Sequence, residues 1–199
     1  MKKYKLIGLT GQSGAGKSTV AELFRQNGAY VINADKLVAE IYKPNSVCVE
    51  VLTSLFGAEI INLDGVLDRK KLAEIVFSEE KYLKQLNSVV HPFVMALFLE
   101  RIKQIQKKDI DMIVYDAPQL FEANADAICD AIVSVTAKKR IRIERICKRD
   151  SITEEQAEQR MNAQFDESVF IKKSDFIIEN NSDFTSLKTQ FDEIFIELP

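Results

Sequence analysis

The chain has 199 residues, of which 46% are hydrophobic and 29% are charged, and this length suits one compact domain with an inserted subdomain. Lys and Arg number 27 against 30 Asp and Glu, so the net charge is −3, which argues against a dedicated nucleic-acid binder. No apolar run reaches the roughly 20 residues that span a bilayer, and the run 6–9 is too short for a secretory signal. We therefore expect a cytoplasmic protein with no nucleic-acid, membrane or obligate protein partner.

Cysteine and histidine are scarce in this sequence. The three cysteines, Cys48, Cys129 and Cys147, lie far apart, and His91 is the only histidine. This spacing gives neither a disulfide framework nor a zinc site, so we expect three reduced, partly buried thiols.

Short apolar runs alternate with amphipathic stretches along the chain. The strands are expected at residues 6–9, 30–32, 112–115, 131–135 and 176–178. The helices are expected at residues 17–27, 37–42, 47–56, 69–77 and 79–107, with a turn at Asp64-Gly65. Strands separated by helices predict an α/β fold, in which helices cover both faces of a five-stranded parallel sheet. The mostly helical stretch 36–110 is too long for one crossover helix, and we interpret it as an insertion that holds a substrate.

A phosphate-binding motif follows the first expected strand. Residues 11–18 read GQSGAGKS, which matches G-x-x-x-x-G-K-[ST] between a strand and a helix. Glycines at 11, 14 and 16 let backbone N–H groups turn inward, where they and the helix N-terminus hold nucleotide phosphates. Lys17 is expected to reach the β and γ phosphates and Ser18 to bind Mg²⁺. The residues expected to bind ATP here are Gly11, Gln12, Ser13, Gly14, Ala15, Gly16, Lys17, Ser18 and Thr19, although Thr19 is equally well an ordinary helix residue.

An acidic residue follows each of two expected strands, Asp35 after 30–32 and Asp116 after 112–115. Ligands bind at this carboxyl edge in open α/β sheets. One carboxylate is expected to hold water around Mg²⁺ and the other to accept a proton from an attacking hydroxyl. Which one lies nearer the metal stays open, as does a role as helix N-cap or loop residue for either.

A basic stretch follows the fourth expected strand. Lys138, Arg142, Arg145 and Arg149 share one face of a helix and have no acidic partners on it. A second helix is expected to start at Thr153 with Gln156 completing a capping box, and Arg160 and Gln164 share one of its faces. We interpret residues 138–165 as a lid that brings arginines to the transferring phosphoryl group. The alternative is a solvated charged face.

Several segments together resemble the dephospho-CoA kinase family over nearly the whole chain. They are the phosphate loop, the acid of Ile32–Asp35, the stretch 64–69, the pair His91-Pro92, the stretch 116–122 (DAPQLFE) and residues 145–164. Pro92 is expected to start or kink a helix, and a lone histidine is more often a packing or capping residue than a catalyst.

The resemblance implies a P-loop NTPase fold and ATP-dependent, Mg²⁺-dependent phosphorylation of the ribose 3′-hydroxyl of dephospho-CoA. It implies a nucleotide-binding core at 1–35 and 111–199 and a CoA-binding insertion at 36–110. The catalytic residues it implies are Lys17, Asp35 as general base and Arg145. It adds Arg149 and Asn180 as ATP contacts. On the acceptor side it implies Asp35, Arg69, His91, Asp116, Pro118 and Phe121.

Three positions depart from the family pattern: Gln119 replaces a usual Leu, Asn33 replaces a frequent Asp, and no arginine follows His91-Pro92 closely. Two other functions also fit a P-loop. One is a kinase of the same fold for a nucleoside, nucleotide or sugar, and the other is a nucleotide-dependent switch. The family-like segments disfavour the first, and the lack of an N/T-K-x-D guanine-reading motif disfavours a GTPase switch.

Overall fold

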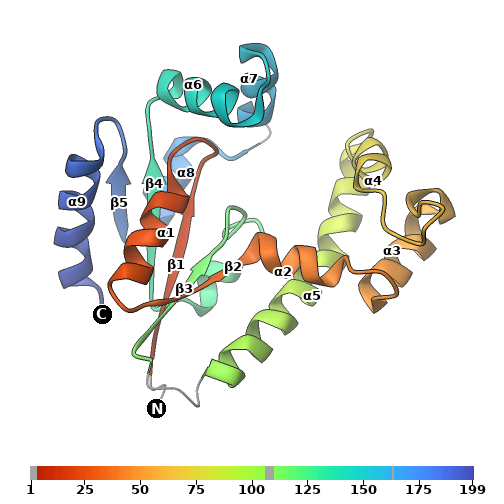
Figure 1. The fold of residues 1–199 in the computed structure, drawn as a ribbon, viewed down its shortest axis with the longest axis horizontal. Helices are drawn as coiled ribbons and strands as arrows, with labels where there is room; N and C mark the ends of the chain where they lie inside the picture. The colour runs from red at the N-terminus through yellow and green to blue at the C-terminus, as the bar shows by residue number, and fades with distance from the viewer. Residues whose placement is uncertain (1–3, 106–109, 163) are drawn as a thin grey trace. The chain divides into compact units, whose positions relative to one another are not determined.

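The computed structural model describes residues 4–105, 110–162 and 164–199. The chain divides into two compact units, Met1–Ile32 with Asp109–Pro199, and Asn33–Lys108. The first unit carries most of the sheet and the second is mainly helical (Figure 1).

The sheet has five parallel strands in the order β2-β3-β1-β4-β5. Their bounds are β1 Lys5–Gly11, β2 Tyr30–Asn33, β3 Met112–Asp116, β4 Ala131–Thr136 and β5 Phe176–Glu179. The register pairs Leu9 of β1 with Asp116 of β3, and Gly11 of β1 with Val135 of β4. All five expected strands are confirmed, and the loop after β1 therefore leaves the sheet beside the end of β3.

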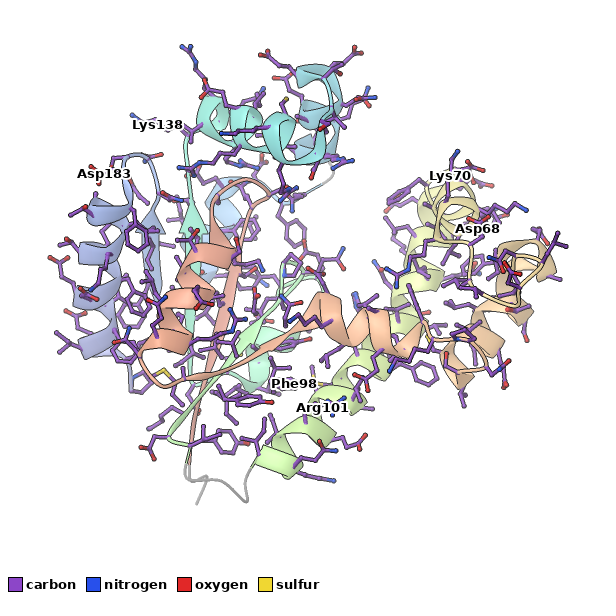
Figure 2. The ribbon with its side chains drawn as sticks, viewed as in Figure 1. Asp68, Lys70, Phe98, Arg101, Lys138 and Asp183 are labelled. Carbon is purple, nitrogen blue, oxygen red and sulfur yellow. The ribbon has the colours of Figure 1, made fainter. Side chains whose placement is uncertain are left out.

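The helices of the first unit are α1 Lys17–Gln26, α6 Lys139–Asp150, α7 Glu154–Asn162, α8 Glu167–Lys173 and α9 Phe184–Glu197. A short 3₁₀ turn, η2, covers Ala125–Ile128. The sequence analysis did not predict α8 or α9. Asp183 caps α9 by accepting a hydrogen bond from the backbone N–H of Ser186 at 2.9 Å (Figure 2).

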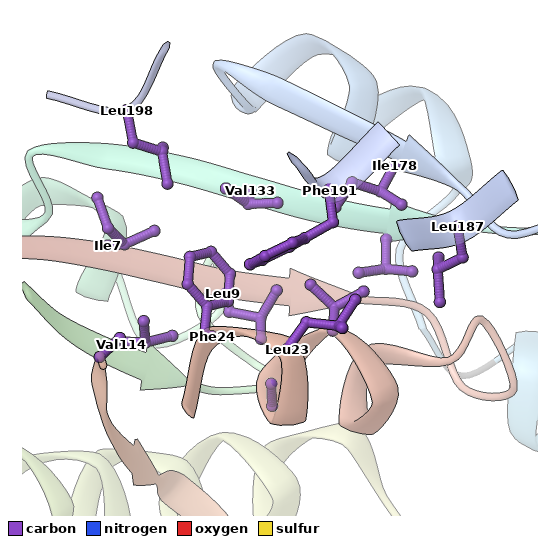
Figure 3. Close-up of a cluster of buried hydrophobic side chains, with 14 of the residues drawn as sticks. Ile7, Leu9, Leu23, Phe24, Val114, Val133, Ile178, Leu187, Phe191 and Leu198 are labelled. Atoms are coloured by element: carbon purple, nitrogen blue, oxygen red, sulfur yellow. The ribbon is translucent and has the colours of Figure 1, made fainter. Parts of the chain in front are cut away.

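Alternating side chains of β1 point to opposite faces of the sheet. Ile7 and Leu9 enter a cluster with residues of α1 and α9 (Figure 3). In this cluster the rings of Phe24 and Phe191 meet edge to face, with centroids 4.9 Å apart. The opposite face has little space at Gly8, where an added Cβ would lie 2.8 Å from Leu120. Packing on both faces gives the phosphate loop a rigid base.

The second unit contains α2 Ala34–Ile41, α3 Val47–Phe56, η1 Ala58–Ile60, α4 Arg69–Val76 and α5 Glu80–Ile105. Helix α2 begins three residues before its expected start because the side chain of Asn33 caps it, accepting from the N–H of Lys36 at 3.0 Å. Pro92 lies inside α5 and does not start a helix. The expected turn is confirmed at Gly65, whose φ is +74°.

Two contacts organise the second unit internally. Nη2 of Arg101 of α5 donates to both carboxylate oxygens of Glu40 of α2 at 2.7 Å, and this ion pair joins the two helices. Asp68 caps α4 by accepting from the N–H groups of Lys70 and Lys71 (Figure 2). Within the described residues, no helix is long and apolar enough to cross a membrane. The three cysteines form no disulfide among the described residues and are at least partly buried, as expected.

Candidate active site

The phosphate loop joins the end of β1 to the start of α1. Gly14 and Gly16 have φ of +79° and +101°, which only glycine adopts without strain. A Cβ on Gly16 would lie 2.2 Å from Nδ2 of Asn180, so this glycine also provides room for a side chain that contacts the loop. The expected use of glycine at these two positions is confirmed.

Side chains from outside the phosphate loop donate hydrogen bonds to the carbonyl oxygens of Gly14 and Ala15. The side chain of Asn180, at the end of β5, donates from Nδ2 to the carbonyl of Ala15 at 2.8 Å. Arg145 of α6 donates from Nη1 to the carbonyls of Gly14 and Ala15, both at 3.3 Å, and from Nη2 to Oδ1 of Asn180 at 3.3 Å. These side-chain donors fix the two carbonyls from outside the loop, while the N–H of Ala15 bonds within the loop to the carbonyl of Gln12 at 3.1 Å.

Helix α1 begins directly after this loop. Gly16 is its N-cap residue, no side chain caps it, and its first turn contains no acidic residue. Ser18 is exposed and Thr19 is partly buried, and the N–H of Thr19 bonds to the carbonyl of Gly16 at 3.0 Å. The first N–H groups of a helix lack intrahelical partners and carry its positive dipole end, so this helix start favours an anion.

Lys17 forms an ion pair with Asp116. Its Nζ donates to Oδ1 of Asp116, whose side chain is buried at the end of β3. The strand register accounts for this meeting, because Asp116 lies opposite Leu9, just before the loop that leads to Lys17. The two sequence-predicted residues are therefore brought together.

The segment after β3 packs against other residues of the first unit. Thr10 donates a hydrogen bond to the carbonyl of Pro118 at 3.4 Å. The ring of Phe121 is 3% exposed and contacts Phe170 of α8, with centroids 5.7 Å apart. Gln119, in place of an expected Leu, is exposed. Phe121 thus has a clear packing role, and its contact with an acceptor stays a prediction.

Glu122 follows Phe121 and has an unusual environment. Its Oε2 is buried and makes no hydrogen bond to any residue that the structure describes. Burial raises the pKa of this carboxyl, while a backbone hydrogen bond and the charge of Lys173 act in the opposite direction. Sequence analysis assigned it no role beyond the family pattern.

The basic face of α6 is only partly as expected. Arg142 is buried, so the alternative of a solvated face is wrong there. Arg149 is exposed and forms two hydrogen bonds, both at 2.8 Å, with Asp150, which also accepts from Arg160 at 2.6 Å. The expectation of cations without acidic partners is therefore wrong at Arg149, because the next residue in the chain pairs with it.

Helices α6 and α7 form the predicted two-helix element. The capping box is confirmed: the N–H of Thr153 donates to Oε1 of Gln156 at 3.1 Å, and the N–H of Gln156 donates to Oγ1 of Thr153 at 3.3 Å. Lys139 and Glu158 join the two helices through an ion pair of 2.7 Å.

The structure places Asp35, Arg69 and His91 in the second unit. Asp35 is exposed in the first turn of α2, and since Asn33 is the N-cap residue, Asp35 does not cap that helix. Arg69 opens α4 with its guanidinium 5.3 Å from the ring centroid of Tyr42, a half-buried residue. Burial and the nearby Cys48 raise the pKa of Tyr42 to about 12, against the opposing effect of Arg69. His91 is half-buried on α5.

Comparison with known proteins gives one consistent family. The family described as dephospho-CoA kinase matches residues 5–186 of this chain. A dephospho-CoA kinase from Fusobacterium nucleatum subsp. nucleatum is 39% identical over 183 residues, which cover 92% of each chain. The crystal structure of TT1252 from Thermus thermophilus is similar with a TM-score of 0.85 at 31% identity, covering 100% of both chains. A dephospho-CoA kinase from Campylobacter jejuni has a TM-score of 0.69 at 28% identity, covering 96% of both chains.

Proposed function

The chain belongs to the dephospho-CoA kinase family and so phosphorylates dephospho-CoA with ATP in coenzyme A biosynthesis, and we propose how its residues divide that work. The acceptor atom is the ribose 3′-hydroxyl. Its oxygen forms a bond to the γ-phosphorus, the bond from that phosphorus to the β–γ bridging oxygen breaks, and ADP leaves. Such a reaction depends mainly on positioning and on neutralising charge.

The phosphate loop binds the triphosphate of ATP. Its N–H groups and the start of α1 hold the phosphate oxygens, and Lys17 shares its charge between Asp116 and the β and γ phosphates. The observation that carries this proposal is the set of side-chain hydrogen bonds to the carbonyls of Gly14 and Ala15. These bonds fix the loop backbone from outside, which supports its role in binding the triphosphate.

Mg²⁺ fits the donor set at the start of α1. The hydroxyl of Ser18 is exposed there, and the carboxylate of Asp116 is held beside Lys17. Mg²⁺ at a phosphate site is usually bound by one or two protein oxygens together with phosphate oxygens. The ion would neutralise charge on the phosphate oxygens, with Ser18 as a direct ligand and Asp116 or Asp35 acting through water.

The second unit, with an insertion at 36–110, holds the acceptor. Asp35 accepts the proton of the 3′-hydroxyl, and its exposure leaves both carboxylate oxygens accessible to a substrate. Arg69 and His91 contact the acceptor, together with Asp116, Pro118 and Phe121 from the core at 1–35 and 111–199. The stacking of Arg69 on Tyr42 limits the orientations of the guanidinium, which supports a role in binding an anionic group.

Residues 138–165 act as the lid. Arg145 stabilises the charge on the transferring phosphoryl group, while Arg149 and Asn180 contact ATP. The bonds of Arg145 to the loop carbonyls support this role, because they hold its guanidinium at the phosphate loop before ATP arrives. A cytoplasmic location and the absence of protein partners stay predictions.

An ADP-release assay with dephospho-CoA tests the function directly. We expect ADP and CoA in equal amounts, with the new phosphate on the ribose 3′ oxygen, as read by NMR of the product. Nucleosides, nucleotides and sugars serve as control acceptors, and a preference for any of them would contradict the proposal.

A further inference from the structure

Arg142 is a buried cation beside the phosphate loop. It lies in the middle of α6, and only 4% of its surface is exposed. A buried guanidinium needs hydrogen bonds and an opposite charge, since arginine stays ionised in proteins and transfer of an unpaired charge from water is costly.

Among the described residues, the side chain of Arg142 donates its hydrogen bonds to two neighbouring residues of the loop. Its Nε donates to the carbonyl of Ser13 at 2.9 Å, and its Nη1 donates to Oε1 of Gln12 at 2.7 Å. The planar guanidinium is suited to holding two loop residues, because its N–H donors are fixed relative to each other and can bond to two acceptors at once. The third nitrogen, Nη2, is buried without a hydrogen-bond partner among the described residues.

The same two loop residues are also held from the segment after α7. Nε2 of Gln12 donates to the carbonyl of Phe165 at 3.1 Å, and the N–H of Ser13 donates to Oε1 of Gln164 at 2.9 Å. Residues 12 and 13 are thus fixed between α6 and residues 164–165. Without Arg142 the carbonyl of Ser13 would lose the donor that α6 provides.

The charge of Arg142 is not matched by a carboxylate in contact with it. No ion pair joins Arg142 to a described acidic residue; Glu167 attracts it without such contact and raises its pKa, whereas burial, the larger effect, lowers it. An anion bound in the neighbouring loop would supply the missing negative charge, and the triphosphate of ATP has this chemistry.

We propose that Arg142 is a positioning residue for the phosphoryl transfer: it holds Gln12 and Ser13 so that the loop accepts the triphosphate of ATP. This inference rests on the proposed role of the phosphate loop. Arg142 acts through the loop backbone and through its uncompensated charge, and it does not contact the acceptor.

The test compares Arg142→Met with Arg25→Met, which removes the same charge at a side chain that is 40% exposed and lies outside the lid. Calorimetric titration with ATP and Mg²⁺ gives Kd, and thermal unfolding without ATP gives stability. Arg142→Met should weaken ATP binding about ten- to a hundredfold, the usual size of a coupling between a binding site and a group that acts on it indirectly. Arg25→Met should change Kd by no more than about twofold.

Steady-state kinetics and a conservative variant separate positioning from a structural role. The KM for ATP should rise in Arg142→Met while the KM for dephospho-CoA stays near that of wild type. Arg142→Lys retains the positive charge but loses the planar guanidinium that donates to two acceptors at once. The Kd of this variant for ATP should therefore lie between those of wild type and Arg142→Met. If Arg142→Met does not fold, Arg142→Lys serves as the test variant, and its Kd for ATP should be higher than that of wild type.

Wild-type Kd in both Arg142 variants, or a lower Tm with unchanged ATP binding, would overturn the inference and leave the proposed function intact. A wild-type protein that bound no ATP would overturn both.

Discussion

Lys17 and Asp116 form an ion pair in which the lysine opens α1 and the aspartate ends β3. Both side chains are largely withdrawn from water. The pair therefore has two consequences, because Lys17 is needed to stabilise a buried carboxylate in the folded protein and to bind phosphates during the reaction. A substitution of Lys17 should affect stability and turnover through different partners, and these effects can be separated.

Lys17→Ala should nearly abolish turnover because it removes the charge that the β and γ phosphates require. It should also lower the free energy of unfolding by about 3–5 kcal/mol, as removal of one partner from a buried pair does. The double variant Lys17→Ala/Asp116→Asn is the control: it should recover much of the stability and none of the activity. Denaturant unfolding and the ADP-release assay measure the two effects. Wild-type turnover in Lys17→Ala would remove this lysine from the mechanism.

Asp35→Asn should lower kcat by about 10²- to 10⁴-fold, the usual contribution of a general base, with a smaller effect on ATP binding. Glu50→Gln is a matched control, since Glu50 is also an exposed acid in the first turn of a helix of the second unit. Rapid-quench measurement of the chemical step distinguishes the two variants. A loss below tenfold for Asp35→Asn would assign this residue to positioning alone.

Gly16→Ala should destroy ATP binding, whereas Gly28→Ala should not. Both glycines have φ near +90°, at +101° and +88°, so alanine brings a similar backbone strain to each. Only at position 16 would the new Cβ collide with Asn180, because nothing lies within 4 Å of a Cβ at position 28. Calorimetric titration with ATP measures the difference. Equal ATP affinity in the two variants would show that the Asn180 side chain moves aside without weakening ATP binding.

Much of this fold follows from local sequence signals. The strands are short apolar runs, and the capping box at Thr153 is a four-residue pattern whose geometry the structure reproduces. The positive φ of Gly14 and Gly16 was predictable because a phosphate loop requires backbone conformations that only glycine adopts without strain. Such features depend on neighbours in sequence, which is why sequence analysis finds them.

The contacts that fix the loop were not predictable in the same way. Arg142 and Gln12 are 130 positions apart, and the sequence around neither residue predicts their 2.7 Å hydrogen bond. Helical spacing placed Arg142 on a basic face, but only the packing of α6 shows that it is buried while Arg149 is exposed. The start of α2 was missed because Asn33 reads equally well as a strand end and as a cap.

Glu122 leads to a prediction about pH and stability. Burial, the largest effect, raises its pKa in the folded protein, so the folded state keeps the proton at a pH where the unfolded chain has already lost it. The folded state therefore binds more protons than the unfolded state in this window, and its stability falls as the pH rises. The full contribution is present below the ordinary pKa range of a glutamate and is lost as the pH passes through the raised value.

Glu122→Gln removes this titration and keeps the shape of the side chain. The difference in Tm, variant minus wild type, should therefore increase as the pH rises from about 4, near the pKa of an unperturbed glutamate, to 7. The slope of this difference is the test, because the buried amide adds an offset that does not change with pH. Glu193→Gln, at an exposed position of α9, is the control and should show a flatter profile. A difference that stays constant with pH would mean that ionisation of Glu122 costs the folded state nothing. A difference that decreases with pH would mean that the backbone hydrogen bond and the charge of Lys173 outweigh burial.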